Sequence, residues 1–484
     1  MRLLAGLLAA FAPGMVPAQD PASAKLQLEP CELRVPGTAI TAPAECGRLD
    51  VPENPEDPDG RKVSLNIARM PASGRSALPD PLVFFAGGPG QAATEAWLLV
   101  AGALRKVNEE RDIILVDQRG TGGSNPLKCP QVEIQDMLGG DWDELERHTR
   151  SCLEGIEGDP RFYTTTIAMQ DYDLVREALG YKQVNLFGGS YGTRAAQVYL
   201  RLFPERVRTV VLDSVMPQDE VMGLDHARNL DRSVFRVLEA CEADADCSAE
   251  FPGTPGKLRA LVEWLETEAV PTAFEHPLTG ETLEFEFDRD ALAGSLRFLM
   301  YSPESQALLP LLISEASESG DFSRLASQML IATAGLEEGI AIGLQNSVMC
   351  AEDYPRFPRD DSAAGLLMGN SLVEATRVQC EVWPRGPVPA GFHEPVRSDT
   401  PTLLLSGELD PVTPPQYGEH TAQYFSNSLH LVGRGQGHIL TNRGCVGDIV
   451  SEFIIEGSVA DLELECLEKL DTTPFFVSLT GPKP

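Results

Sequence analysis

The stretch Gln183–Thr193 (QVNLFGGSYGT) decides the fold, because it carries a buried strand into a helix through a glycine-rich turn. An apolar run leads into the turn, and Tyr191–Phe203 follows with the spacing of a helix. The turn has the pattern G-x-S-x-G, with Ser190 between Gly188 and Gly192. Small residues at those two positions let strand and helix pack close around a strained turn that exposes the serine. The stretch therefore predicts a strand–turn–helix unit that presents Ser190 as a nucleophile.

Apolar runs of the same kind recur along the chain at intervals suited to β-α-β units. Each run is short, rich in Val, Ile, Leu or Phe, and bounded by turn residues, which is typical of strands buried on both faces of a parallel sheet. The runs are Pro81–Ala86, Asp112–Asp117, Gln183–Phe187, Arg208–Asp213, Thr400–Leu405 and Ser428–Val432. Ahead of them, Lys62–Met70 alternates like a strand after a Pro-rich entry.

The region from 216 to 398 differs, because helical runs replace the strand-like ones. These runs include Asn229–Ala240, Lys257–Thr267, Gln306–Ala316 and Phe322–Ala334. The pattern predicts an α/β fold of the α/β-hydrolase type, with a mostly parallel central sheet and a mostly helical cap inserted after its sixth strand. We expect residues 19–215 and 399–484 to form the two parts of the core, and residues 216–398 to form the cap.

The N-terminus is typical of a secretory signal peptide. One arginine precedes a short apolar run that ends in small residues, with cleavage expected after Ala18. A membrane anchor is the alternative, but the run is short and is broken by Pro13, Gly14 and Pro17. We therefore expect residues 1–18 to be removed, no membrane span, and a secreted or periplasmic protein.

The ten cysteines are even in number, and secretion places them in an oxidising compartment. They fall into five neighbouring pairs along the chain, so we expect local disulfides. The expected pairs are Cys31–Cys46, Cys129–Cys152, Cys241–Cys247, Cys350–Cys380 and Cys445–Cys466. A metal site is disfavoured, because no CxxC pattern occurs and the histidines do not cluster with the cysteines. No cofactor is expected.

The formal net charge of −33 makes this a strongly acidic protein. Such a surface repels nucleic-acid phosphates and anionic lipid, which excludes nucleic acid as a partner. We interpret most of the charge as a contribution to solubility, although it also suits a cationic substrate. A monomer is the favoured state.

A reactive serine needs a base, and the base needs an orienting carboxylate. In this fold the order along the chain is serine, acid, histidine. Asp410 and His438 each follow one of the two late strands, and glycines flank the loop of His438. Asp213, which ends the strand after the nucleophile helix, is the rival acid. We predict a triad of Ser190, Asp410 and His438, and we interpret the other histidines as structural.

An oxyanion hole requires two backbone N–H donors. Tyr191, directly after the nucleophile, is expected to supply one of them. The other is expected from the loop Gly87–Gly90, where glycines let the backbone approach a reacting carbonyl. Gly87 and Gly88 are both candidates, and Gly88 is favoured. The loop is not expected to be a phosphate-binding loop, because no GK[ST] motif follows it.

A second glycine-rich loop, DQRGTGGS, spans residues 117–124. An ion pair between Asp117 and Arg119 is expected to order this loop near the nucleophile. Its role is expected to be structural rather than chemical.

Taken together, the motifs resemble those of the proline iminopeptidase and tripeptidyl aminopeptidase group of α/β hydrolases. The matching pieces are GGPG at 87–90, DQRGTGGS at 117–124, GGSYGT at 188–193, GELDPVTP at 407–414 and GQGH at 435–438. Two cysteine-bearing pieces, at 241–252 and 348–353, are similar to the larger, secreted tripeptidyl aminopeptidase-like branch. One departure is Ala86, where the short members of the group carry histidine.

The resemblance implies a helical cap and hydrolysis from the free N-terminus of a peptide substrate. An enzyme of this kind must hold an α-ammonium group, which requires a carboxylate in or under the cap. Glu352 and Asp353 lie next to Cys350 in one of the matching segments, so both are candidates for this role. The alternative is a solvated acidic turn in an acidic protein.

Three functions from different classes remain open. The first is a serine aminopeptidase that releases one residue or a short peptide, such as a tripeptide or proline, through an acyl-enzyme. The second is a carboxylesterase or lipase-like hydrolase that uses the same triad, since acyl transfer to water is common to both. The third is a binding protein without activity, which the complete set of triad residues disfavours.

Overall fold

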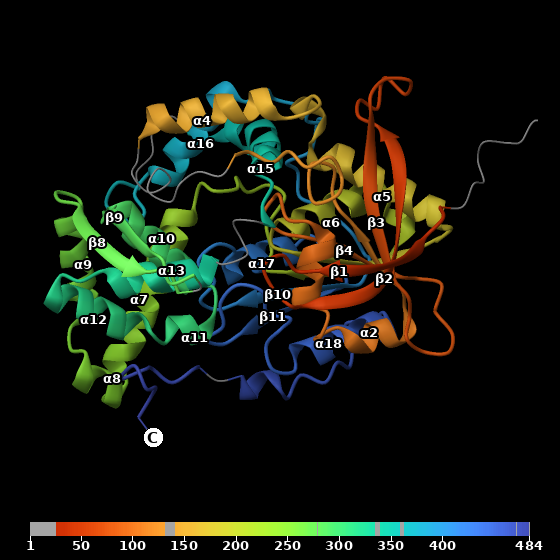
Figure 1. Ribbon diagram of the computed structural model, residues 1–484. Coiled ribbons are helices and arrows are strands. Elements are labelled where there is room, and N and C mark those ends of the chain that lie inside the picture. The colour runs from red at the N-terminus through yellow and green to blue at the C-terminus, as the bar shows by residue number, and fades with distance from the viewer. Residues whose placement is uncertain are drawn as a thin grey trace, which may run out of the picture.

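The computed structural model describes residues 26–130, 141–277, 279–333, 339–358, 363–470 and 472–483. Their centre is a nine-stranded sheet with the order β1-β2-β3-β5-β4-β6-β7-β10-β11 (Figure 1). Its strands are β1 (Glu29–Arg34), β2 (Thr41–Pro52), β3 (Lys62–Met70), β4 (Leu82–Phe85), β5 (Ile113–Val116), β6 (Val184–Gly189), β7 (Val207–Asp213), β10 (Thr402–Gly407) and β11 (Ser428–Gly433). The six strands from β5 to β11 in this order pair in parallel, and β1, β2 and β3 are antiparallel. The sheet is therefore mostly parallel, as predicted.

Helices cover both faces of the parallel strands, which explains their continuous apolar runs. On β4, Val83 and Phe85 join the apolar cluster that includes α5 (Thr165–Leu179) and α6 (Tyr191–Leu202). The alternate residues of the same strand join the cluster on the opposite face, with α2 (Arg105–Glu110) and α18 (Val446–Glu456). Two short or peripheral core helices are α1 (Ala93–Ala96) and α17 (Pro415–Ala422). A strand buried on both faces has no polar side to alternate with, so it reads as an unbroken apolar run.

The N-terminal strands β1 and β2 were not predicted. They form a hairpin at the edge of the sheet, and β2 pairs with β3 from Glu45 to Pro52. Most side chains of β1 are exposed or half-buried, so the strand lacks the apolar run that marked the central strands. Because β1 and β2 come first, the inserted region begins after the seventh strand of the described chain rather than the sixth.

The inserted region lies between β7 and β10 and has an apolar core of its own, separate from the two cores of the sheet. It is mostly helical, with one two-stranded hairpin, and it forms the lobe of α7 to α13 in Figure 1. Its elements are α7 (His226–Ala243), α8 (Ala245–Glu250), α9 (Thr254–Leu265), β8 (Val270–Glu275), β9 (Thr282–Phe287), α10 (Arg289–Leu299), α11 (Pro303–Gln306), α12 (Leu309–Ser319), α13 (Ser323–Thr333), α15 (Ile342–Val348) and α16 (Ser371–Val382).

One helix from the segment expected to be core lies against this inserted region. Helix α4 (Trp142–Gly155) comes between β5 and α5 in the chain, yet it lies beside α16 (Figure 1). Cys152 of α4 packs with Cys380 and Trp383 of the inserted region in one buried cluster. The two lobes are thus joined by a segment that chain order alone assigns to the core.

All ten cysteines form disulfides, each with its neighbour in chain order, which is the expected pairing. The bonds are Cys31–Cys46, Cys129–Cys152, Cys241–Cys247, Cys350–Cys380 and Cys445–Cys466. The expected signal peptide, residues 1–18, lies outside the described residues. No helix within the described ranges is long and apolar enough to cross a membrane.

Candidate active site

Ser190 lies at the turn between β6 and α6 with a backbone conformation that L-residues rarely adopt, φ 56° and ψ −124°. Hydrogen bonds on both sides hold this turn. The Ser190 N–H donates to the carbonyl of Asp213 at 2.9 Å, and the Thr193 hydroxyl donates to the carbonyl of Ser190 at 2.6 Å. A strained backbone of this kind persists only where the surroundings fix it, and such residues cluster at functional sites.

The two glycines of the motif are required by space. A Cβ on Gly188 would lie 2.2 Å from the carbonyl oxygen of Gly192, and a Cβ on Gly192 would lie 2.1 Å from that of Phe85. Neither distance is compatible with a side chain. The glycines therefore let β6 and α6 pack tightly enough to form the turn under Ser190.

Asp410 and His438 form a hydrogen-bonded pair in the loops that follow β10 and β11. The Nδ1 atom of His438 lies 2.7 Å from Oδ2 of Asp410, and both side chains are buried. The other carboxylate oxygen of Asp410 accepts the backbone N–H groups of Val412 and Thr413 at 2.8 and 2.9 Å. Burial alone raises the pKa of Asp410, but the charge and hydrogen bond of His438 outweigh it and hold the pKa below its ordinary value.

Thr413 contacts both residues of this pair, and the sequence analysis missed it. Its hydroxyl donates to Oδ2 of Asp410 at 2.8 Å and lies 3.3 Å from Nδ1 of His438. The available signal was its position three residues after Asp410, where an aspartate commonly bonds the turn that it begins. Thr413 thereby helps to fix the orientation of the Asp410 carboxylate relative to the imidazole.

Tyr301 of the inserted region covers His438 and was also missed. The backbone N–H of His438 donates to the Tyr301 carbonyl at 3.0 Å, and the two rings lie 4.9 Å apart between centroids. A Cβ on Gly437 would lie 2.4 Å from the same carbonyl, so glycine lets the two segments meet. Only the folded chain brings residues 301 and 438 together, and no local pattern predicts the contact.

Asp213, the rival acid, bonds elsewhere. Its carboxylate accepts the N–H groups of Leu440 and Thr441, both at 2.8 Å, and the hydroxyl of Thr441 at 2.6 Å. The carboxylate that bonds the imidazole of His438 is that of Asp410. Burial raises the pKa of Asp213, although these hydrogen bonds act in the opposite direction.

The glycine loop after β4 lies directly against the nucleophile turn. A Cβ on Gly87 would lie 3.3 Å from Cβ of Ser190, and Gly88 has φ 104°, a conformation that favours glycine. Tyr191 opens α6, and the first N–H groups of a helix have no acceptor within it. The backbone of this loop and the start of α6 thus face the same place, beside Ser190.

Glu352 and Asp353, the two expected ammonium-binding residues, lie in a π-helical turn, Met349–Asp353, and both are buried. Glu352 accepts the N–H of Thr165 at 2.7 Å and its hydroxyl at 2.8 Å. That hydroxyl also lies 2.7 Å from the Tyr191 hydroxyl, which connects Glu352 to the residue after Ser190. Burial raises the pKa of Glu352 to about 7.

Asp353 has a different partner. Its two carboxylate oxygens accept hydrogen bonds from Arg194 of α6 at 3.0 and 2.8 Å, and neither side chain is exposed to solvent. The backbone N–H of Met222 donates to the same carboxylate at 2.8 Å. The charge of Asp353 is therefore already matched inside the protein, whereas that of Glu352 is held by neutral donors.

The expected ion pair between Asp117 and Arg119 is wrong. Arg119 bonds Asp171 of α5 at 2.6 and 2.8 Å, and Asp117 accepts hydrogen bonds from Thr94 and from the N–H of Gly123. Both residues lie in the loop after β5, where two residues close in sequence need not face each other, so closeness in sequence misled the expectation. Both side chains are buried in contacts that order the loop.

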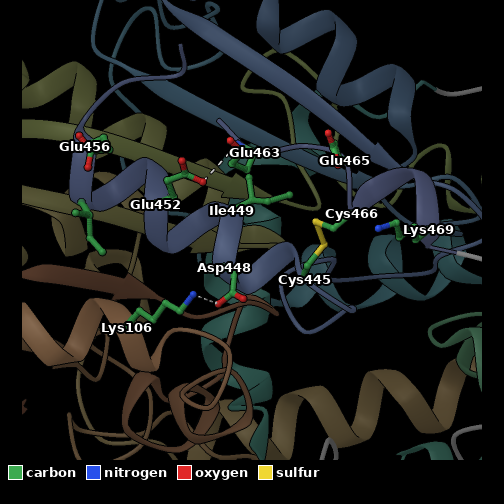
Figure 2. A pocket seen from close by; sticks show the side chains of 11 residues that line it. Lys106, Cys445, Asp448, Ile449, Glu452, Glu456, Glu463, Glu465, Cys466 and Lys469 are labelled. Carbon is green, nitrogen blue, oxygen red and sulfur yellow. Dashed lines mark hydrogen bonds and ion pairs between the residues drawn. A yellow bond between two sulfur atoms is a disulfide. The ribbon is translucent and has the colours of Figure 1, made fainter. Parts of the chain in front are cut away.

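A pocket of about 580 Å³ lies away from this site, between α18 and the segment that ends at Lys469 (Figure 2). Acidic side chains of α18 line it together with the disulfide Cys445–Cys466, and Lys106 pairs with Asp448 at its edge, 2.9 Å apart. It shares no lining residue with the triad. Within the described ranges, no group of three or more His, Cys, Asp or Glu residues has the arrangement of a metal site.

Comparison with known proteins agrees with this geometry. Residues 80–238, which include Ser190, match the family described as α/β hydrolase fold. Residues 366–466, which include Asp410 and His438, match the family described as TAP-like protein.

Three curated relatives resemble nearly the whole chain. Serine protease Hip1 of Mycobacterium tuberculosis is 26% identical, with 90% of each chain covered. Tripeptidyl aminopeptidase of Streptomyces lividans is 24% identical, with 88% of this chain and 84% of the relative covered. Carboxylesterase B of Mycobacterium tuberculosis is 25% identical, with 96% and 94% covered.

Proposed function

We propose that this chain, which has the α/β-hydrolase fold with a TAP-like C-terminal segment, is a secreted serine aminopeptidase that releases an N-terminal residue or short peptide. The observation that carries the proposal is the bond between Asp410 and His438, in loops beside the strained turn of Ser190. The resemblance to tripeptidyl aminopeptidase supports the peptide substrate, and the five disulfides support secretion.

In the proposed mechanism, Oγ of Ser190 attacks the scissile carbonyl while its proton passes to Nε2 of His438. Asp410 accepts the Nδ1–H of His438 throughout and stabilises the imidazolium that forms. When the C–N bond breaks, His438 returns the proton to the leaving amine, and the acyl group stays on Ser190. Water then attacks the ester, again through His438, and regenerates the free serine.

The negative oxygen of the tetrahedral intermediate needs donors that are already in place. We assign this role to the N–H groups of Gly88 and Tyr191. The N-terminal end of α6 adds its positive dipole at the same place. The role of Gly87 is then steric, because its missing Cβ leaves room for the acyl group beside Ser190.

We assign recognition of the substrate ammonium group to Glu352. Among the described side chains of Lys, Arg and His, none forms an ion pair with Glu352. A buried carboxyl with neutral donors and a raised pKa gains most from a cation, because an ammonium group would favour its ionised form. Asp353 supports this role through Arg194, since their ion pair fixes the turn that carries both carboxylates.

A carboxylesterase is the second candidate, favoured by the similarity to carboxylesterase B. A panel of aminoacyl, prolyl and tripeptidyl chromogenic amides, each free and N-acetylated, separates the two. We expect the free forms to be cleaved far faster than the acetylated ones, with Ser190→Ala as the inactive control. Hydrolysis of N-blocked esters together with failure on every free amide would reject the peptidase.

Within the peptidase, Glu352→Gln tests the ammonium site. The amide keeps the shape and the hydrogen bonds from Thr165 but removes the charge. We expect KM for free-amine substrates to rise on the order of tenfold or more while the weak reaction with acetylated substrates stays unchanged. An equal loss on both substrate types would place Glu352 outside substrate recognition.

A further inference from the structure

Asp213 joins the turn of Ser190 to the segment that follows His438. Its backbone carbonyl accepts the N–H of Ser190 at 2.9 Å. Its carboxylate accepts three hydrogen bonds from Leu440 and Thr441, each of 2.6 to 2.8 Å. The side chain itself has no exposure to solvent.

The next residue repeats this arrangement. The hydroxyl of Ser214 accepts the backbone N–H of Ile439 at 2.8 Å. Ser214 and Ile439 both have positive φ, 60° and 68°, which is uncommon for residues other than glycine. Asp213 and Ser214, at the end of β7, therefore accept hydrogen bonds from residues 439–441. These bonds hold the segment in a backbone conformation that it would otherwise leave.

We call the hydrogen bonds from Asp213 and Ser214 to residues 439–441 the clamp. The register of the strands places the clamp beside the turn of Ser190. Asp213 is paired with Gly189 on one side of β7 and with Leu405 on the other. The Cδ1 atom of Ile439 lies 3.4 Å from the Cβ position of Gly189, directly before Ser190. The clamp thus fixes the segment after His438 against β6 rather than at a distant part of the fold.

The charge of Asp213 is not neutralised by a cation bonded to it. Among the described residues, no lysine or arginine forms an ion pair with it, and its hydrogen-bond donors are neutral. The hydrogen bonds from Leu440 and Thr441 are therefore the contacts that hold this buried carboxylate in place.

We propose that Asp213 is a positioning residue that holds the loop of His438 in register with Ser190. The proposal rests on the proposed function, because it assigns to Asp213 a part in the use of the same triad. It differs from the rival role of Asp213 as the triad acid, since the carboxylate that bonds the imidazole is that of Asp410.

The test compares Asp213→Asn with a matched control, Asp112→Asn. Asp112 is also buried and directly precedes β5; its carboxylate accepts the N–H of Ala72 at 2.8 Å and the hydroxyl of Tyr181 at 2.6 Å, and it lies 3.8 Å from Arg69. Each change replaces a buried, hydrogen-bonded carboxylate with an amide of the same size. Both variants are expected to have a similarly lowered thermal stability. A difference in activity between them therefore reflects where each residue lies in the fold, and not a general loss of stability.

For Asp213→Asn we expect kcat to fall on the order of 100-fold with KM changed less than about threefold, because a misplaced base impairs chemistry more than binding. Asp112→Asn is expected to keep both kcat and KM.

Thr441→Val supplies a milder variant in case Asp213→Asn does not fold. It removes one of the three hydrogen bonds to Asp213, so kcat is expected to fall less than in Asp213→Asn. Wild-type protein that neither hydrolyses substrate nor reacts with a fluorophosphonate at Ser190 would overturn the proposed function. Active wild type together with unchanged kcat in folded Asp213→Asn and Thr441→Val would overturn this inference alone.

Discussion

The backbone of His438 is held by a residue of the inserted region: its N–H donates to the carbonyl of Tyr301 at 3.0 Å, and the two rings pack 4.9 Å apart. The proposed base is thus oriented from two directions, by Asp410 from the core and by Tyr301 from the cap. Movement of the inserted region would displace the base as well as the substrate.

Tyr301→Ala separates the ring contact from the backbone bond, because alanine keeps the carbonyl. Loss of the aromatic contact is worth about 0.5–1.5 kcal/mol, so we expect kcat to fall about three- to tenfold. Tyr301→Phe keeps the ring and is expected to retain kcat. Steady-state kinetics on a tripeptidyl amide measures both, and a loss shared equally by the two variants would assign the effect to the hydroxyl.

Asp410→Asn keeps the size of the side chain but removes the acceptor of the imidazole N–H. We expect kcat to fall on the order of 10⁴-fold with little change in KM, because the imidazole then adopts the wrong tautomer and its cation is not stabilised. Single-turnover hydrolysis and the rate of fluorophosphonate labelling at Ser190 provide the measurement. Labelling at the wild-type rate would contradict a role for Asp410 as the triad acid.

Glu352 predicts a pH dependence of stability. Burial raises its pKa from 4.5 to about 7, so the folded protein binds this proton more tightly than the unfolded chain. Its contribution is therefore complete below about pH 4.5 and is lost as the pH rises through about 7, by about 3 kcal/mol in all. We expect Glu352→Gln to lose less stability than wild type between pH 5 and pH 8 in urea unfolding. Parallel curves would contradict the prediction.

The ion pair between Arg194 and Asp353 has no solvent exposure on either side. Arg194→Met leaves a buried carboxylate without its partner, so we expect a loss of about 3–5 kcal/mol of unfolding free energy. Asp353→Asn combined with Arg194→Met removes both charges and is expected to recover much of this loss. Urea unfolding of the two variants decides the matter, and a double variant no more stable than the single one speaks against it.

The central strands and the strained turn of Ser190 could be predicted from sequence because each has a local cause. A strand covered on both faces needs a continuous apolar run, as in Ile113–Val116, and a nucleophile turn needs glycines at fixed positions. The edge strand Glu29–Arg34 has no such cause, because solvent reaches most of its side chains.

Contacts between distant segments had no signal in the sequence. Tyr301 meets His438 across 137 positions of the chain, and Arg119 bonds Asp171 rather than the nearby Asp117. Glu352 and Asp353 likewise looked equivalent in the sequence but have different partners. Asp353 pairs with Arg194, and Glu352 bonds Thr165. Partner choice of this kind depends on the packing of whole elements.

The separate apolar core of the inserted region has an evolutionary consequence. Leu230, Phe287 and Leu292 belong to a cluster that, among the described residues, includes none from the nine-stranded sheet. Substitutions in this cluster can change the shape of the inserted region while the strands that precede Ser190, Asp410 and His438 keep their geometry. Related proteins can therefore diverge in the inserted region and still present these three residues in the same way.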